Sequence, residues 1–477
     1  MIRLALLLLV ALPASAQIET ATQLLDSLGV TAALPEAERD AALDALWSDL
    51  QTGERIPFAA GDSAVFLWRG DASLSEVAGD HTGWRPAPAE RFGDVWARAE
   101  RFDPAARVDY KWVIDGNWIL DPNNPHRQWS GFGANSELRM PQWAFPTETI
   151  RQDGVPQGTL SAPQSIASTR YGRTVRYRVW TPAGMTPGRP TVYVTDGQEY
   201  ADDRLGALHI VLDNLVAEGR IEPPVVVFID PRVGGQNLRA EQYVQNPDFA
   251  AFVARELVPV IDAAYPTRPE RGARVILGTS LGGLFSAYLG LEHPDVFGRL
   301  AIQSPAFWVS ESNDWSGPSI YERMADSPSF FRVAMQTGTI RDTEDGARRM
   351  RTVMNAGGTD LTYAEVPEGH SWGNWRATLD LLLEALLPPG AVVNEPEPDA
   401  ALRLSATPNP TRGDFTLQVE GARDSVRLAC IDTLGRTVWE GAGVHAVVPA
   451  DSLVAGVYQC TAHADGWQAT RALTVVR

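Results

Sequence analysis

The feature that most constrains this chain is the alternation of short apolar runs with amphipathic stretches between residues 146 and 390. The runs consist largely of Val, Ile and Leu, which is typical of strands buried on both faces of a sheet. Apolar residues at helical spacing separate them, for example over residues 249–261 and 375–387. We therefore expect an α/β fold with a mainly parallel sheet. The candidate strands are residues 191–195, 225–229, 274–277, 300–302, 331–335 and 361–366.

The strand at residues 274–277 leads into a G-x-S-x-G motif at residues 278–282 and then into a helix over residues 284–291. At such a junction the tight turn strains the serine backbone and lifts its hydroxyl clear of the sheet, and the two glycines leave room for the turn. We predict Ser280 as the nucleophile of a hydrolase. The alternative is a glycine-rich loop that packs under a helix.

A serine nucleophile needs an imidazole base, and in α/β-hydrolases the base comes last in the chain order Ser, acid, His. Four histidines follow Ser280. His293 ends the helix after the motif, and His445 and His463 lie in the C-terminal region. His370 remains, on a loop between a strand and the last helix, so it is the candidate base. A polar surface histidine is the alternative.

The acid is expected after the strand at residues 331–335, where three carboxylates compete. Thr343 is a natural N-cap, and Glu344 and Asp345 would then occupy the first helical turn, where the helix dipole favours negative charge. Helix formation thus accounts for two of the three. Asp342 is the predicted acid, with Glu344 as the runner-up.

Two backbone N–H groups must stabilise the oxyanion of the tetrahedral intermediate. The residue after the nucleophile, Leu281, supplies one. The other is expected in the tight turn after the strand at residues 191–195, and we place it at Gln198.

Several short motifs carry a family resemblance over about residues 150–390. The chain resembles the esterase family that includes enterochelin esterases, feruloyl esterases and the mycolyltransferase antigens. The motifs are Asp196-Gly197-Gln198, Arg239-Ala240-Glu241 followed by Asn246, Glu256-Leu257-Val258-Pro259, Gly278 to Gly283, Ser304-Pro305-Ala306-Phe307-Trp308 and Gly369-His370-Ser371-Trp372.

This resemblance implies an α/β-hydrolase core that acts on carboxylic esters. It implies Ser280 and His370 as catalytic residues, with an acid at or near Asp342. The family acid often stands three residues after the glycine of its loop. Here Gly338 plus three is Arg341, so Asp342 departs from that pattern by one residue.

The N-terminal part contains apolar residues at helical spacing over residues 17–55 and a β-rich stretch over residues 56–145. The stretch resembles the early-set β-sandwich of glycogen-binding modules, on residues 79–84 and 110–122. The resemblance implies a carbohydrate platform built from Trp84, Lys111 and Trp118, and Lys111 is the only lysine of the chain. The alternative is a domain that packs on the hydrolase and shapes its cleft.

The C-terminal part begins with a Pro-rich acidic linker at residues 391–402. Period-2 strands and turns over residues 403–477 predict a small β-sandwich. This region resembles a type IX secretion sorting domain, which implies passage across an outer membrane; a plain adhesion sandwich is the alternative. Cys430 and Cys460 either pair within this sandwich or remain free thiols. The motifs are Pro408-Asn409-Pro410, Ile431 to Arg436, Ala455 to Tyr458 and Leu473 to Arg477.

The extreme N-terminus, residues 1–16, has the charged, apolar and small-residue order of a secretory signal peptide, with Gln17 as the expected first mature residue. The net charge is −18, which disfavours nucleic acid as a partner. Two cysteines and seven scattered histidines predict no metal site. No run is long enough for a membrane span, and no cofactor is expected.

These features together predict a secreted or cell-surface serine esterase of the enterochelin-esterase-like type, which forms an acyl-enzyme on Ser280. Its expected substrate is a small-molecule or polysaccharide-linked ester, and its expected partner is a secretion machinery. The expected fold is an α/β-hydrolase core with an N-terminal and a small C-terminal β-sandwich. The alternatives are a feruloyl or acetyl esterase acting on plant polysaccharide, and a non-catalytic carbohydrate-binding surface protein.

Overall fold

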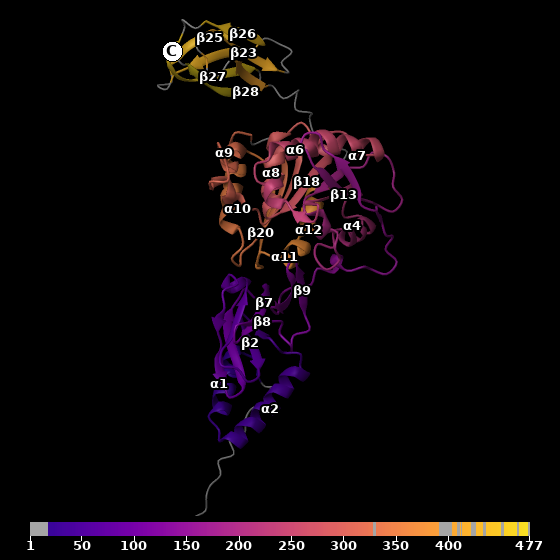
Figure 1. Ribbon diagram of the computed structural model, residues 1–477, viewed down its shortest axis with the longest axis vertical. Coiled ribbons are helices and arrows are strands. Elements are labelled where there is room, and N and C mark those ends of the chain that lie inside the picture. Colours follow the sequence, from indigo (N-terminus) through magenta and orange to yellow (C-terminus); the bar gives the residue numbers. More distant parts are fainter. Residues whose placement is uncertain are drawn as a thin grey trace, which may run out of the picture. The chain divides into compact units, whose positions relative to one another are not determined.

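The computed structural model describes residues 18–327 and 331–390, and residues 403–475 except 408–410, 412, 421–425, 433–435, 450–452 and 465–466. The chain divides into two compact units, Met1–Ala391 and Val392–Arg477 (Figure 1). The predicted signal peptide, residues 1–16, and the predicted linker, residues 391–402, lie outside the described residues.

The larger unit is built around a mixed sheet with the order β11-β13-β15-β14-β18-β19-β20-β21, and β12 pairs with β13. From β15 to β21 all neighbours are parallel. β13 runs antiparallel to β15. The six strands predicted from apolar runs form this parallel part, so the predicted α/β class is confirmed. The strands are β11 Thr159–Leu160, β12 Gln164–Ala167, β13 Thr174–Thr181, β14 Thr191–Val194, β15 Val225–Asp230, β18 Arg274–Thr279, β19 Arg299–Gln303, β20 Arg332–Gly338 and β21 Asp360–Val366.

Helices cover both faces of this sheet. Successive residues of a strand point to opposite faces, so each strand contributes side chains to two separate cores. In β18, Ile276 joins the core formed with α6 to α10, whereas Val275 and Leu277 join the core formed with α4, α11 and α12. The helices are α3 Gly197–Tyr200, α4 Leu208–Ala217, α5 Arg239–Tyr243, α6 Pro247–Phe252, α7 Val258–Ala264, α8 Leu281–Glu292, α9 Ile320–Ala325, α10 Glu344–Ala356, α11 Trp372–Ala377 and α12 Leu379–Leu386.

Two predicted helices are interrupted. The segment predicted as one helix over residues 249–261 contains a π-helical turn, Val253–Leu257. Pro259 follows this turn. Proline has no N–H to donate to the carbonyl four residues earlier, and its ring would clash with that carbonyl. The wider π-helical turn relieves this clash. The helix predicted over residues 375–387 is divided at Thr378, whose hydroxyl donates to carbonyl oxygens of the preceding turn.

The N-terminal module, residues 18–145, contains two helices and two antiparallel sheets, ordered β1-β2-β6-β5 and β4-β3-β7-β10-β9, with β8 paired to β7. Side chains of both sheets share one buried cluster, and α1 and α2 cover the other face of the first sheet. The elements are α1 Ala21–Ala32, α2 Glu36–Thr52, β1 Phe58–Ala60, β2 Ser63–Arg69, β3 Ser75–Gly79, β4 Ala87–Pro88, β5 Glu90–Phe92, β6 Val95–Arg101, β7 Arg107–Ile114, β8 Asn117–Ile119, β9 Arg127–Ser130 and β10 Gly133–Arg139.

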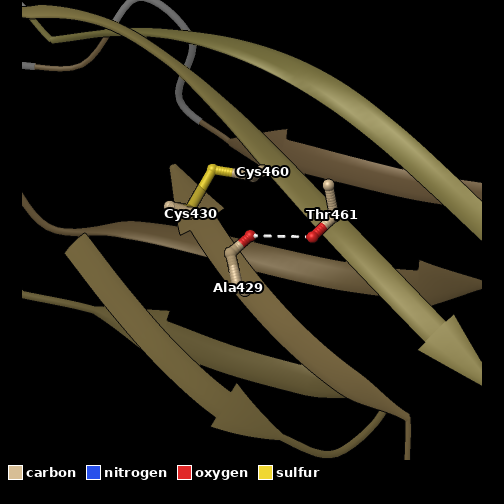
Figure 2. Close-up of a disulfide and its surroundings, with 4 residues drawn as sticks. All are labelled: Ala429, Cys430, Cys460 and Thr461. Carbon is tan, nitrogen blue, oxygen red and sulfur yellow. Dashed lines mark hydrogen bonds between the residues drawn. A yellow bond between two sulfur atoms is a disulfide. The ribbon is translucent and has the colours of Figure 1, made fainter. Parts of the chain in front are cut away.

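The C-terminal unit has two antiparallel sheets in its described residues, β22-β23-β26 and β25-β24-β27-β28. Cys430 and Cys460 are direct partners on β24 and β27 and form a disulfide (Figure 2). Beside it, the Thr461 hydroxyl donates to the carbonyl oxygen of Ala429 at 3.4 Å. Of the two alternatives for the cysteines, the structure therefore has the paired one. The strands are β22 Arg403–Thr407, β23 Phe415–Glu420, β24 Arg427–Ile431, β25 Thr437–Ala442, β26 His445–Val448, β27 Gly456–Ala464 and β28 Trp467–Val475.

The described part of the chain contains neither a membrane-spanning helix nor a metal-binding cluster. None of its helices combines the length and apolarity that crossing a membrane requires. Its His, Cys, Asp and Glu side chains nowhere form a group of three placed to hold a metal ion.

Candidate active site

Ser280 occupies the turn between β18 and α8, with a φ of 58° and a ψ of −120°. Its N–H donates to the carbonyl of Gln303 at 3.0 Å, and its own carbonyl accepts from Ala306 at 3.0 Å, so neighbouring loops hold the strained turn. A Cβ on Gly278 would lie 2.3 Å from the carbonyl oxygen of Gly282, so only glycine fits there. Steric exclusion in this turn therefore requires the first glycine of the G-x-S-x-G motif, the motif from which Ser280 was predicted as the nucleophile.

His370 connects the serine to a carboxylate. Its Nε2 lies 3.1 Å from Ser280 Oγ, and its Nδ1 lies 2.5 Å from Asp342 Oδ1. The imidazole and a Trp375 ring lie nearly perpendicular, at a ring-centroid distance of 4.9 Å. The three residues that sequence reasoning selected from separate loops thus meet in one hydrogen-bonded row.

The side chain of Asp342 is fully buried, and its second oxygen accepts three hydrogen bonds. The donors are the N–H of Gly338 at 2.5 Å, the Ser304 hydroxyl at 2.5 Å and the Thr337 hydroxyl at 3.2 Å. These bonds fix the carboxylate so that its first oxygen faces His370. Arg341, directly before Asp342, has a φ of 50°, in the left-handed region.

Glu344, the runner-up, begins α10 as expected. No hydrogen bond joins it to His370 within the described residues, whereas Asp342 makes that bond. The expectation that the Thr343 side chain caps α10 is wrong. Thr343 holds the N-cap position, but its hydroxyl faces the Thr337 hydroxyl at 3.3 Å instead of an N–H of the first turn.

The two residues proposed to donate hydrogen bonds to the oxyanion lie in different helices. Leu281 is the first residue of α8, where N–H groups have no acceptor within the helix. Gln198 lies in α3, and it lines a separate cavity of about 330 Å³ with Arg176 and Arg232. Gln198 therefore stays a predicted donor through its backbone N–H, while its side chain does not line the serine pocket.

Ser280 and His370 open into a cavity of about 640 Å³ whose walls come from both the hydrolase part and the N-terminal module. The lining residues are Asp80, Trp84, Asp109, Lys111, Trp118, Ser130, Gly131, Phe132, Asn135, Asp196, Glu199, Asn237, Arg239, Thr279, Ser280, His370, Ser371, Trp372 and Trp375.

Trp84, Lys111 and Trp118 were predicted as a carbohydrate platform of their own. In the structure all three line the cavity of Ser280, and the two indoles stack at a centroid distance of 6.4 Å. These side chains thus form a wall of the candidate active site, as the alternative of a cleft-shaping module described. Whether this wall binds sugar stays a prediction.

Sequence reasoning assigned no role to several residues of this cavity. Phe132, at the tip of the β9–β10 hairpin, is fully exposed, and an aromatic residue flanked by two glycines was the available signal. Burial raises the pKa of Asp196 to about 6, although Arg239 beside it, at 2.7 Å, acts in the opposite direction. Both residues belong to the family motifs. Glu199 accepts from the Trp372 indole N–H at 2.9 Å.

Asp80 connects the cavity wall to the loop of His370. Its carboxylate accepts from the N–H of Asp109 at 2.9 Å and the Trp84 indole at 3.1 Å. A Cβ on Gly369 would lie 2.3 Å from its carboxyl carbon. Burial and the charge of Asp109 raise the pKa of Asp80 to about 8, against the weaker opposing effect of Arg107.

This raised pKa predicts a pH-dependent stability. An acid with a raised folded-state pKa contributes stability below the unfolded pKa of about 4, and that contribution is lost as the pH rises to about 8. In Asp80→Asn the decline of Tm over this window should be shallower than in the wild type, as measured by calorimetry. Asp71→Asn, at a fully exposed position, should follow the wild-type slope. Equal slopes for Asp80→Asn and wild type would contradict the assignment.

Comparisons with known proteins bear on the chemistry of this site. Residues 168–386 match the model of the family described as Putative esterase. Over 196 residues the chain is 31% identical to the iron(III) enterobactin esterase of Escherichia coli strain CFT073, covering 40% of this chain and 46% of that protein. It is 25% identical over 205 residues to the uncharacterized protein YjcH of Bacillus subtilis, covering 41% and 83% of the two chains.

Among solved structures, ferric enterobactin esterase from Salmonella typhimurium has a similar fold, with a TM-score of 0.58 and 22% identity. The likeness covers 68% of this chain and 93% of that one. This share is larger than residues 168–386, so the shared fold extends beyond the part matched by the family model. Taken together, the family match and the enterobactin esterase relative support an esterase, and hence a hydrolase.

Proposed function

We propose that this protein is a serine carboxylic ester hydrolase that works through an acyl-enzyme on Ser280. The observation that carries the proposal is the hydrogen-bonded row from Ser280 through His370 to Asp342, with its serine end open to a cavity large enough for a drug-sized ester. The match to esterases supports the reaction class.

In the first half-reaction His370 Nε2 takes the proton of Ser280 Oγ as the oxygen attacks the ester carbonyl carbon. The buried Asp342 holds the imidazole in the required tautomer and stabilises its positive charge. The N–H of Leu281, and in our proposal that of Gln198, donate to the carbonyl oxygen as it becomes negative. The tetrahedral intermediate then expels the alcohol, which leaves with the proton from His370.

In the second half-reaction water attacks the acyl group on Ser280. His370 takes a proton from that water and returns one to Ser280 Oγ as the acid is released. The proton balance closes, since ester and water are consumed, alcohol and acid are released, and Ser280 and His370 return to their starting states.

The substrate class is a second part of the proposal. The relative's name suggests an enterochelin-type ester, that is, an iron-binding one. The second candidate is a feruloyl or acetyl ester on a polysaccharide, and the cavity wall that would meet either ligand carries four carboxyl side chains and two cations. The carboxyl residues are Asp80, Asp109, Asp196 and Glu199, and the cations are Lys111 and Arg239.

Three substrates separate these alternatives. The purified protein should be assayed with ferric enterobactin, methyl ferulate and acetylated xylan, each also with Ser280→Ala. Preferred turnover of ferric enterobactin would assign the siderophore class, and preferred turnover of either other ester would assign the polysaccharide class. Binding to glycans without hydrolysis of any ester would favour the remaining alternative, a non-catalytic surface protein.

The identity of the acid gives a separate prediction. Asp342→Asn should lower kcat for p-nitrophenyl acetate by about 10²-fold or more, because the amide cannot orient and stabilise the imidazolium. Glu344→Gln should stay within about threefold of the wild type, since its side chain makes no bond to His370 in the described residues. The comparison is made by steady-state kinetics at equal protein concentration. The reverse order would transfer the role to Glu344.

The C-terminal unit is proposed as a secretion sorting domain, and the protein as secreted or attached to the cell surface. Because residues 392–477 form a compact unit of their own, deleting residues 403–477 should leave kcat/KM for p-nitrophenyl acetate within about twofold of the full chain. In the native host the same deletion should stop export, as measured by fractionation and immunoblotting. Loss of activity in the purified truncated protein would contradict the independence of the unit.

A further inference from the structure

Arg107, the first residue of β7 in the N-terminal module, reaches the loop that carries His370. Its guanidinium is 1% exposed. One nitrogen, Nη1, donates both to Glu368 Oε2 and to Ser371 Oγ, each at 3.2 Å. These two partners flank the segment Gly369–His370 of residues 367–371, which we call the histidine loop. A single nitrogen thus holds the loop on both sides of the proposed base.

The remaining nitrogens of Arg107 fix the guanidinium itself. Nε donates to Glu137 at 2.5 Å, and Nη2 donates to Asp109. The charges of Asp109, Glu137 and Glu368 hold the pKa of Arg107 well above its ordinary value, outweighing the opposing effect of burial. The cation is therefore charged and oriented before any substrate binds.

The backbone of the loop and a glycine of the following helix, α11, add further contacts with Arg107. The N–H of Arg107 donates to the carbonyl of Pro367 at 3.2 Å, which extends β7 onto the loop. A Cβ on Gly373 would lie 2.0 Å from the guanidinium carbon of Arg107, so the cation lies flat on the first turn of α11. Because packing this close excludes alternative loop positions, the loop cannot shift without moving the module.

The acid loop, residues 339–343, which carries Asp342, also contacts the N-terminal module. Ile340 packs against the buried cluster shared by the module's two sheets, and Arg341 donates to the carbonyl oxygen of His81 at 2.9 Å. Ile340 also donates through its N–H to the carbonyl of Glu368 at 3.1 Å, which ties the acid loop to the histidine loop. The two loops that bring Asp342 and His370 together are therefore anchored to the same module.

From these contacts we infer that Arg107 is a positioning residue for His370, so that the N-terminal module completes the catalytic geometry as well as lining the cavity. The inference rests on the proposed function. Its physical basis is that a displacement of about 1 Å in a catalytic group can lower a rate by about 10²-fold, whereas Arg107 itself does not line the cavity that would bind substrate. Loss of Arg107 should therefore lower kcat and leave KM nearly unchanged.

The test uses the full chain and three variants. Arg107→Lys keeps a positive charge, but an ammonium cannot reproduce the planar fork that reaches Glu368, Ser371, Glu137 and Asp109 together. Ser371→Ala removes one of the two bonds that the guanidinium makes to the loop and leaves the ion pairs intact. Arg69→Lys is the matched control, because Arg69 pairs with Asp94 and Asp44 elsewhere in the same module.

The readout is kcat for p-nitrophenyl acetate per active serine, with active serines counted by complete reaction with a fluorophosphonate. Dividing by this count removes any effect of a partly unfolded sample. For Arg107→Lys we expect kcat per active serine to fall about tenfold or more with KM within about threefold of the wild type. Ser371→Ala should fall by about threefold, and Arg69→Lys should stay within about twofold.

Each outcome decides the inference. An unchanged kcat per active serine in Arg107→Lys would overturn it even if the Tm falls, since the contact would then be structural only. If Arg107→Lys yields no folded protein, an unchanged kcat in Ser371→Ala overturns it and a lowered one supports it. A wild type that neither reacts with the fluorophosphonate nor hydrolyses esters would overturn the proposed function itself, which is a distinct result.

Discussion

Replacing Ser280 or His370 by alanine should abolish ester hydrolysis, with kcat/KM reduced by about 10³-fold or more. Without the hydroxyl no acyl-enzyme forms, and without the imidazole the hydroxyl keeps its proton. Because the two side chains act as a unit, the double variant should be no slower than the slower single variant. Progress curves with p-nitrophenyl acetate measure all three.

The fold should survive these changes. Ser280 has a strained backbone, and its hydroxyl faces the cavity, so alanine removes no buried packing. The Tm of Ser280→Ala should therefore stay within about 2 °C of the wild type. Ser310→Ala, at a buried serine outside the cavity, controls for loss of a hydroxyl as such and should retain activity. If Ser280→Ala retained a tenth of the wild-type rate, Ser280 would not be the nucleophile.

Removing the cation of Arg107 should have the largest effect on stability. In Arg107→Met the carboxylates of Asp109, Glu137 and Glu368 remain buried without their common partner. Breaking a buried ion pair in this way costs about 3–5 kcal/mol of unfolding free energy. Urea denaturation monitored by tryptophan fluorescence measures the loss.

The pH dependence identifies the cause of that loss. Uncompensated carboxylates are relieved by protonation, so the loss in Arg107→Met should be largest near pH 7.5 and should shrink as the pH falls toward 5. A loss caused only by a cavity would not change with pH. Arg255→Met is the control, because its ion pair with Asp295 is exposed and should contribute less than about 1 kcal/mol. Equal losses of unfolding free energy in Arg107→Met and Arg255→Met would contradict the explanation by unpaired buried carboxylates.

Much of the candidate site could be predicted because its signals are local. The strand before Ser280, the two glycines and the following helix are adjacent in sequence, and steric exclusion around the turn is settled within a few residues. Asp342 was separated from Glu344 by the chemistry of a helix start, which is also local. His370 followed from the chain order and from the regions in which the other histidines lie.

Other features lay beyond local reasoning. The side-chain cap expected from Thr343 is absent, since its hydroxyl faces Thr337 on the neighbouring strand end instead. Trp84, Lys111 and Trp118 were recognised as a group, but their place in the serine cavity depends on how the module meets the hydrolase part. Phe132 reaches the same cavity from a hairpin tip.

The sequence by itself determined the α/β class, the strained turn at Ser280, and the choice of His370 and Asp342, because backbone sterics, apolar periodicity and chain order act over short distances. Only the tertiary structure decided that the N-terminal module forms a wall of the active site and holds the histidine loop. Arg107 and Glu368 are separated by 261 residues. In sequence each is one charged residue among many, and only burial in a shared interface makes the charges depend on one another.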